Sequence, residues 1–279
     1  MYNTGLYNTA LYNSLFTFPA TADKADIEFN GYSLQNSSII VSKISYDNLP
    51  ERDYQTASIP RGNGLIENSD FWRKKIITLT GTARKSTRAE FEALIDEMKK
   101  NLSGAKGNLD IRISNESGNI RRFISTLQTL IFNRDSFNVD FAPFEISFLV
   151  LTPFGTDIDY TSDSFIGISD LTFTEEIEVS GTVETDSIII LNFLSASSVS
   201  KVNIKNNTNG QEVEITASIS ASDYLKIDGV SGAVTINGVN NDFDGVFIGL
   251  DTGINNLSVT VTGTSATYDL TIKRLNSYL

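Results

Sequence analysis

The sequence has 279 residues, of which 40% are hydrophobic, and its formal net charge is −12. It contains neither His nor Cys, which excludes Ser-His-Asp triads, cysteine nucleophiles, disulfides and zinc sites with thiolate or imidazole ligands. The acidic balance argues against a nucleic-acid partner, because phosphate binding needs clustered Lys and Arg. The longest apolar runs have the length of a strand and are too short to span a membrane. Carboxylate chemistry remains open, as a glycosidase-type pair or a calcium site.

The first 15 residues repeat a short phrase in which Tyr2, Tyr7 and Tyr12 each precede Asn. Steps of five do not stack these rings on one face of a helix. In a strand, odd steps would place them on alternating faces. The segment also lacks the basic, apolar and cleavage regions of a signal peptide. Such a repeat suits a position between two surfaces that must both be covered.

The first half of the chain alternates short apolar runs with turn signals, which predicts strands. The predicted strands are 27–29, 38–44, 73–81, 109–113, 120–125, 129–133, 136–141 and 144–151. We expect the last of these to be buried on both sides in its final residues, because Leu149 and Leu151 face away from the stripe that contains Phe148.

Residues 47–70 are rich in Pro, Gly, Asn and charge, which predicts a long loop or an exposed hairpin. Trp72, the only Trp, follows at the start of the next strand, where packing or an interface contact is favoured over a ligand platform. Two basic clusters stand out. We interpret Arg121-Arg122 as a charged strand edge. Arg73-Lys74-Lys75 has either that role or a contact with an acidic neighbour.

One helix is predicted, over residues 86–103. Thr87 and Glu90 have the spacing of a capping box. Lys99 and Lys100 lie in the last turns, where they favour the helix dipole. Five apolar residues form a stripe wide enough to pack on one side only, so we expect this helix to lie on a sheet. The stripe consists of Phe91, Leu94, Ile95, Met98 and Leu102.

Residues 152–157 have the composition of a linker, and the chain after about residue 160 is predicted to be an all-β sandwich. From residue 160 on, 15 acidic residues face only 5 basic ones, whereas the first part is nearly neutral. This asymmetry favours two domains with different surroundings. We therefore divide the chain into residues 1–20, 21–156 and 157–279.

One segment has the spacing of a calcium-binding loop, with oxygen-bearing side chains around Gly245. The candidate ligands are Asn240, Asp242, Asp244 and Asp251. The flanking residues predict strands and not the helices of an EF-hand, so a polar connection between strands is the favoured interpretation. Asp157, Asp159 and Asp163 form a second acidic cluster, which we interpret as a solvated run. No pair of carboxylates stands out as catalytic.

The order of these features resembles the distal tail proteins of long-tailed, siphovirus-type bacteriophages. The segments that carry the resemblance in the first half are 39–44, 59–64, 72–81, 86–91 and 151–154. Those in the second half are 201–210, 223–228, 234–238 and the run to Leu279. One departure is Arg61-Gly62-Asn63-Gly64, where an acidic residue is expected before the second Gly. The Tyr-Asn repeat lies outside the resemblance.

The resemblance implies a mainly β fold. Its first domain would be a tail-tube-like β-sandwich or barrel with one packed α-helix, and its second a galectin-like or carbohydrate-binding-module-like β-sandwich. It implies a structural virion protein without catalysis or cofactors, which forms a ring of six copies at the tail tip or baseplate hub. The ring would join the tail tube to the hub and the receptor-binding proteins. Assembly would take place in the host cytoplasm, with neither nucleic acid nor membrane as a partner.

In such a ring the long loop and Trp72 would contact neighbouring subunits. The interface candidates are Tyr2, Tyr7, Tyr12, Ile59, Pro60, Arg61, Gly62, Gly64 and Trp72. We expect residues 1–20 to form an arm that lies between subunits, because Tyr gives amphipathic contact area at modest entropic cost. A terminus without a role is the alternative.

Two other functions remain as alternatives. A carbohydrate-binding module of a host-adsorption device would need an aromatic platform in the second half, where the available tyrosines are Tyr160, Tyr224, Tyr268 and Tyr278. A glycosidase would need a carboxylate pair, and the sequence nominates none.

Overall fold

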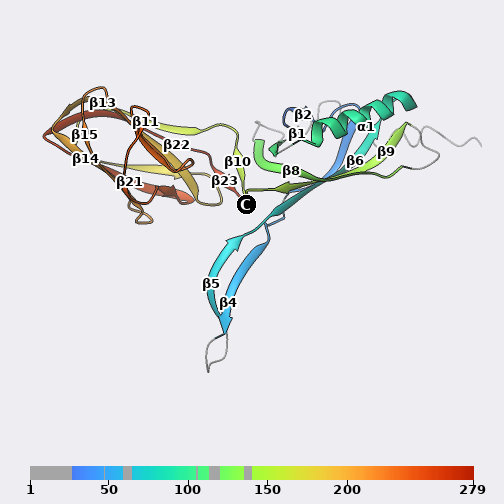
Figure 1. Cartoon of the computed structure of the whole chain (residues 1–279), viewed down its shortest axis with the longest axis horizontal. Coiled ribbons are helices and arrows are strands. Elements are labelled where there is room, and N and C mark those ends of the chain that lie inside the picture. Colours follow the sequence, from blue (N-terminus) through green and yellow to red (C-terminus); the bar gives the residue numbers. More distant parts are fainter. Residues whose placement is uncertain (1–26, 47, 59–64, 105, 113–119, 135–139) are drawn as a thin grey trace, which may run out of the picture.

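The computed structural model describes residues 27–46, 48–58, 65–104, 106–112, 120–134 and 140–279, and it shows two β-rich units with a hairpin that projects away from both (Figure 1). Within 54–58 and 65–71 only the backbone is described. The first unit contains β1 (Ile27–Phe29), β2 (Tyr32–Ser33), β3 (Ile39–Ser45), β4 (Arg52–Ser58), β5 (Leu65–Trp72), β6 (Lys75–Arg84), α1 (Arg88–Leu102), β7 (Gly107–Arg112), β8 (Ile120–Phe132), β9 (Phe141–Val150) and β10 (Gly155–Asp157).

The second unit is built from strands throughout. They are β11 (Thr161–Ile168), β12 (Thr172–Val179), β13 (Thr185–Ser197), β14 (Val199–Asn206), β15 (Glu212–Ile219), β16 (Tyr224–Asp228), β17 (Ala233–Ile236), β18 (Val239–Asn240), β19 (Asp244–Gly245), β20 (Gly249–Leu250), β21 (Gly253–Thr262) and β22 (Ser265–Arg274), and β23 (Ser277–Tyr278) follows. The prediction of a mainly β fold is confirmed, and α1 is the one helix of the described residues.

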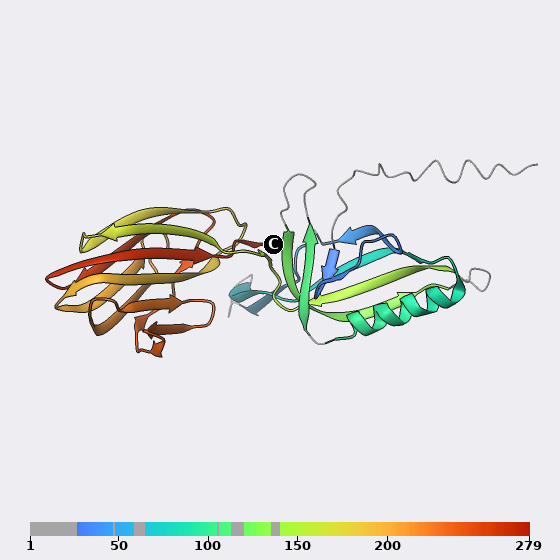
Figure 2. The same cartoon turned by 90° about the horizontal axis from the view of Figure 1, so that it is seen from above.

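The first unit is an antiparallel sheet with the order β2-β1-β7-β8-β9-β6-β3, and α1 covers one of its faces (Figure 2). The helix begins at Arg88 and not at the predicted residue 86, because Thr87 is its N-cap: the Thr87 side chain accepts a hydrogen bond from the Glu90 N–H at 3.3 Å. The five residues of the predicted apolar stripe are all buried against the sheet. Periodicity in the sequence was therefore enough to orient this helix.

Three expectations for the first unit were wrong. Residues 120–125 and 129–133 belong to one long strand, β8, which bends at a bulge between Leu127 and Thr129. Leu149 is only partly buried, and Leu151, which follows β9, is 46% exposed, so the final residues of this segment are not fully buried on both sides. The expected linker 152–157 contains β10, which pairs with β8. Of the predicted strand 136–141, residues 136–139 lie outside the described residues.

The segment around residues 47–70 forms the hairpin of β4 and β5, whose register runs from Arg52 opposite Trp72 to Ser58 opposite Leu65. Trp72 is the last residue of β5, and β6 begins only at Lys75, so the expectation that Trp72 opens the next strand was wrong. Among the described residues, β4 and β5 pair only with each other. They leave the first unit as a separate two-stranded arm (Figure 1).

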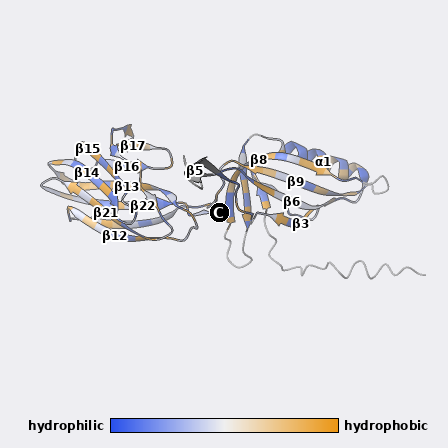
Figure 3. Cartoon of the chain, turned by 90° about the horizontal axis from the view of Figure 1, so that it is seen from below, coloured by the Kyte–Doolittle hydropathy of each residue, from blue (hydrophilic) through white to orange (hydrophobic). Residues whose placement is uncertain are grey.

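The second unit consists of two antiparallel sheets that enclose a core of their own. The larger sheet has the order β11-β22-β13-β16-β17-β18, and the smaller has the order β12-β21-β14-β15-β19. Inward and outward side chains alternate along the strands, as Figure 3 shows by hydropathy. The buried residues of this core run from Ile168 to Ile272, and those of the first core from Ile27 to Val150. Each unit therefore has its own hydrophobic centre.

The centre of the first core can be tested at Phe148, which is fully buried and whose ring centroid lies 5.0 Å from that of Phe29. We expect Phe148→Ala to lower the free energy of unfolding by about 3–5 kcal/mol, because it removes a large buried side chain and leaves a cavity. Phe141→Ala, on the same strand but 37% exposed, is the matched control and should cost far less. Urea unfolding followed by Trp72 fluorescence measures both, and equal losses would contradict the assignment.

Candidate interface region

The base of the β4–β5 hairpin is held by its own side chains. The Arg52 guanidinium lies 4.4 Å from the centroid of the Trp72 ring, a cation–π contact. Arg73 pairs with Asp53, and this pairing raises the pKa of Arg73. The Arg73 N–H also donates to the Glu51 carbonyl at 2.6 Å. The two strands therefore enter and leave the first unit at a fixed point.

Residues of both basic clusters have partners within the chain. Arg73 pairs with a residue of its own hairpin, and Lys75 is buried with its ammonium 5.4 Å from the centroid of the Phe123 ring. Arg121 and Arg122 do not lie at a strand edge, which corrects that interpretation, because β8 is paired there with β7 on one side and β10 on the other. Charge in the sequence identified these positions but not their neighbours.

The hairpin has the properties of a surface that binds another chain. A two-stranded ribbon is only marginally stable in water, and within the described part of the chain both of its outer edges present backbone N–H and C=O groups without strand partners. A neighbouring strand can pair with such an edge. Of the predicted contact residues on the hairpin, Trp72 lies at its base and is partly buried. Ile59, Pro60, Arg61, Gly62 and Gly64 lie outside the described residues, as do Tyr2, Tyr7 and Tyr12.

The face of the first sheet opposite α1 is a second open surface. Side chains on this face alternate with the buried ones of β6, β8 and β9, and three of them are large and apolar. These are Ile76, Ile131 and Phe141, with exposed fractions of 38%, 48% and 37%. Serine and threonine lie between them, including Thr78 and Ser147, whose hydroxyls are 3.3 Å apart. No described residue of the core cluster covers this face.

The candidate calcium ligands do not converge. Asp244 lies in β19, opposite Glu214 of β15, and Asp251 lies beyond β20, with its N–H donating to the Asn255 side chain. Asn240 ends β18, so the segment with Asp242 connects an edge of one sheet to an edge of the other. Among the described residues, no three Asp or Glu side chains are grouped in a way that could hold a metal ion.

The tyrosines of the second half are divided between surface and interior. Tyr160 and Tyr224 are 44% and 39% exposed. Tyr268 is fully buried, and its burial raises its pKa to about 12. Tyr278 contacts Arg121 of the first unit. Two of the four tyrosines thus pack against other residues of the chain, which leaves Tyr160 and Tyr224 for an aromatic platform.

In the described part of the chain, no helix is both long and apolar enough to cross a membrane.

The comparison with known proteins first gives the class of protein that part of the second unit resembles. Residues 180–273 match the family described as siphovirus-type tail component, C-terminal domain. This segment lies within the second unit and includes most of both its sheets. No curated protein matches the chain.

A particular structure then matches nearly the whole chain. The chain is similar to the crystal structure of SPP1 Dit (gp 19.1), described as a paradigm of the hub adsorption apparatus in Gram-positive infecting phages, with a TM-score of 0.69 and 12% identity over 91% of this chain and 99% of that one. It also matches a chain of the phage p2 baseplate in its activated conformation with Sr, at 11% identity over 90% and 97% of the two chains. The TM-score of that second match, 0.42, is too low to carry an argument. The resemblance to distal tail proteins is confirmed.

The contact at the hairpin base can be tested through the single Trp. We expect Arg52→Ala to shift the emission maximum of Trp72 to longer wavelength, because it removes the guanidinium from the ring face, and to lower stability by about 0.5–1 kcal/mol. Lys43→Ala, an exposed cation on β3, is the control and should leave the emission unchanged. An unchanged spectrum in Arg52→Ala would show that the ring is not held in this way.

Proposed function

We propose that this protein is a structural component of the tail tip of a long-tailed phage, and that its first unit forms a closed ring, a hexamer, between the tail tube and the hub. The observation that carries the proposal is the similarity to SPP1 Dit over 91% of this chain and 99% of that one, together with the family match of residues 180–273. The role is mechanical and needs neither catalysis nor a cofactor. The protein would be part of the virion and would assemble in the host cytoplasm.

The open edges of the first unit support a ring. In a closed rotational assembly, each copy offers one surface to the copy before it and another to the copy after it, so that no edge is left free. The β4–β5 hairpin and the edge strand β3 are unpaired on their outer sides among the described strands. Residues 21–156 would therefore form the ring, and residues 157–279 would be peripheral. The strongly acidic composition of the second part suits an outer, solvated position.

The partners follow from this position. The tail-tube protein would contact one side of the ring, and the hub and receptor-binding proteins the other. The hairpin is the element that reaches farthest from both units, so it suits a contact across the ring or toward one of these neighbours (Figure 1). Residues 1–20, with Tyr2, Tyr7 and Tyr12, would form an arm that lies between subunits.

Light scattering of the purified chain at several concentrations tests the ring. We expect a species near six times the chain mass of 30.6 kDa. Replacing residues 52–72 by a short Gly-Ser link should shift the mass toward the monomer, because it removes the arm with two open edges. A hairpin-deleted chain that still forms the full oligomer would contradict the role of the hairpin. A monomer at every concentration would contradict self-assembly.

The arm is tested by removing residues 1–15 in the same experiment. We expect a weaker oligomer whose dissociation constant rises by about tenfold, which corresponds to roughly 1.4 kcal/mol of lost contact free energy. A control chain with Tyr2, Tyr7 and Tyr12 changed to Ser keeps the length but loses the rings. If both chains assemble like the parent, the repeat has no role in assembly.

A further inference from the structure

The two units are connected twice. The chain passes from the first unit to the second through β10, and residues 275–279 then return from β22 to the first unit's sheet. We call residues 275–279 the return segment. Its strand β23 pairs with β10, placing Gly155 opposite Tyr278 and Thr156 opposite Ser277, and β10 in turn pairs with β8. The sheet of the first unit thus continues into residues that follow the last strand of the sandwich (Figure 1).

Backbone hydrogen bonds fix the return segment to both units at once. On the side of the first unit, the Asp157 N–H donates to the Asn276 carbonyl at 3.1 Å. On the other side, the Ser277 carbonyl accepts from the N–H groups of Thr182 and Val183, at 2.8 and 3.3 Å. Thr182 and Val183 precede β13, a central strand of the sandwich. Two neighbouring residues of the return segment, Asn276 and Ser277, are therefore bonded to different units.

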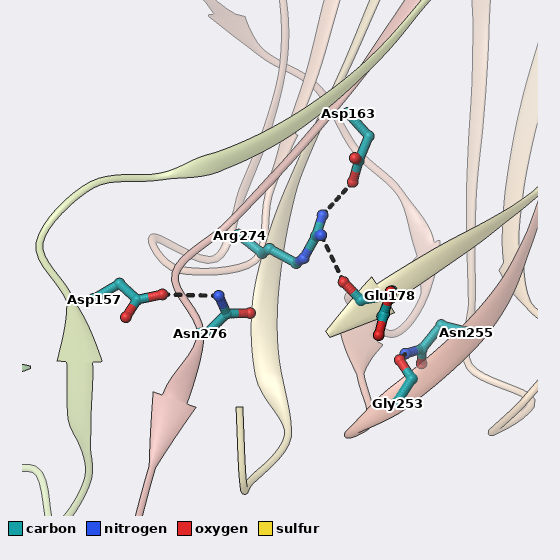
Figure 4. Close-up of polar contacts among 7 residues, drawn as sticks. All are labelled: Asp157, Asp163, Glu178, Gly253, Asn255, Arg274 and Asn276. Carbon is teal, nitrogen blue, oxygen red and sulfur yellow. Dashed lines mark hydrogen bonds and ion pairs between the residues drawn. The ribbon is translucent and has the colours of Figure 1, made fainter. Parts of the chain in front are cut away.

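Side chains fasten the segment to the first unit. The Arg121 guanidinium lies 4.1 Å from the centroid of the Tyr278 ring. Figure 4 shows the Asn276 amide, which donates a hydrogen bond to Asp157 at 2.8 Å. Burial raises the pKa of Tyr278, and the charge of Asp157 raises it further, whereas the charge of Arg121 lowers it. Arg122, the next residue of β8, makes two 2.8 Å hydrogen bonds to Asp110 of β7. The receiving strand is therefore itself held in place.

Arg274 fastens the other end of the segment to the sandwich. Its side chain is nearly buried, pairs with Asp163 of β11, and donates to the Glu178 carbonyl of β12 at 2.6 Å (Figure 4). β11 belongs to the larger sheet and β12 to the smaller one. Arg274 thus joins both sheets just before the chain leaves the sandwich. A force on the return segment would therefore be transmitted to both sheets of the second unit.

Two glycines allow the close approach that this arrangement needs. A Cβ at Gly181 would lie 2.5 Å from the Ser277 carbonyl oxygen, and a Cβ at Gly155 would lie 2.7 Å from the Phe123 ring. Any other residue at Gly181 would push the return segment away from the sandwich. At Gly155 a side chain would push β10 away from the first core. At Gly181 the backbone lies against the backbone of the return segment, and at Gly155 it lies against a ring of the first core.

We propose that the return segment is a clasp that locks the two units in one fixed orientation. Two units joined by a single connection normally move relative to each other, because the interface between them is small and polar. Here the second connection closes the junction with paired backbone, the Arg121–Tyr278 contact and the Asp157–Asn276 hydrogen bond. The second unit is therefore a rigid lever, and a displacement of its outer end moves the sheet of the first unit. This inference does not depend on the ring.

The proposal can be tested with spin labels attached to Cys, because the sequence contains no Cys that would also react. Spin labels are placed at Lys100→Cys on α1 and at Ser218→Cys on β15, both exposed positions, and the distance between them is measured by pulsed electron paramagnetic resonance. We expect one narrow distribution in the full-length chain. Adding Arg121→Ala and Tyr278→Ala should broaden it about twofold or more, because these changes remove the side-chain contact that holds the return segment against β8, and the backbone pairing with the three-residue strand β10 then has to hold the segment there. Tyr224→Ala, a half-exposed Tyr away from the junction, is the matched control and should keep the distribution narrow.

A graded pair of variants separates an open clasp from a misfolded unit. Tyr278→Phe keeps the ring over Arg121 and should stay close to the parent, whereas Tyr278→Ala alone should broaden the distribution with unchanged near-ultraviolet circular dichroism. A narrow distribution of unchanged mean in the Arg121→Ala/Tyr278→Ala chain would overturn the proposal. So would a broad distribution in the labelled chain that carries neither substitution.

Discussion

Backbone pairing at strand edges is the constraint on which the rest of this structure depends. A β-rich chain must either pair the N–H and C=O groups along its edges, cover them or leave them available to another chain. The first and the last of these solutions occur here. At the junction, β10 and β23 extend the first sheet and tie it to the sandwich. At the hairpin, β4 and β5 pair with each other and leave their outer edges open.

These two solutions explain how the molecule is divided. The junction satisfies its backbone internally, so the units behave as one body through residues that lie far apart in the sequence. The hairpin leaves its outer edges unpaired among the described residues, which makes it the element best suited to a neighbouring copy or another tail protein. The distribution of charge agrees with this division. The nearly neutral first part carries the open edges of the hairpin, and the acidic second part lies away from them. In the proposed ring, assembly and projection would therefore belong to different parts of the chain.

The sequence was sufficient where a local rule decides the structure. The stripe from Phe91 to Leu102 and the Thr87 cap set the helix, and turn signals predicted that the second unit is built from strands. It was insufficient where distant partners decide. From the sequence alone, Arg121 is interpreted as a surface charge. In the fold its guanidinium contacts the ring of Tyr278, which is more than 150 residues away in the chain. Residues 155–157 read as a linker because three residues have too little pattern to show that both β8 and β23 flank them. The interface residues were inferred from resemblance, and Trp72 is the one whose surroundings are described.

Hydrogen–deuterium exchange of the hairpin tests the central claim most directly. Amides of β4 and β5 that face outward should exchange within seconds in the monomer, because no strand pairs with them. In the assembled oligomer the same amides should become protected, while those of the buried strand β9 change little. If the hairpin is equally fast in both states, its open edges are not the surface through which this protein assembles.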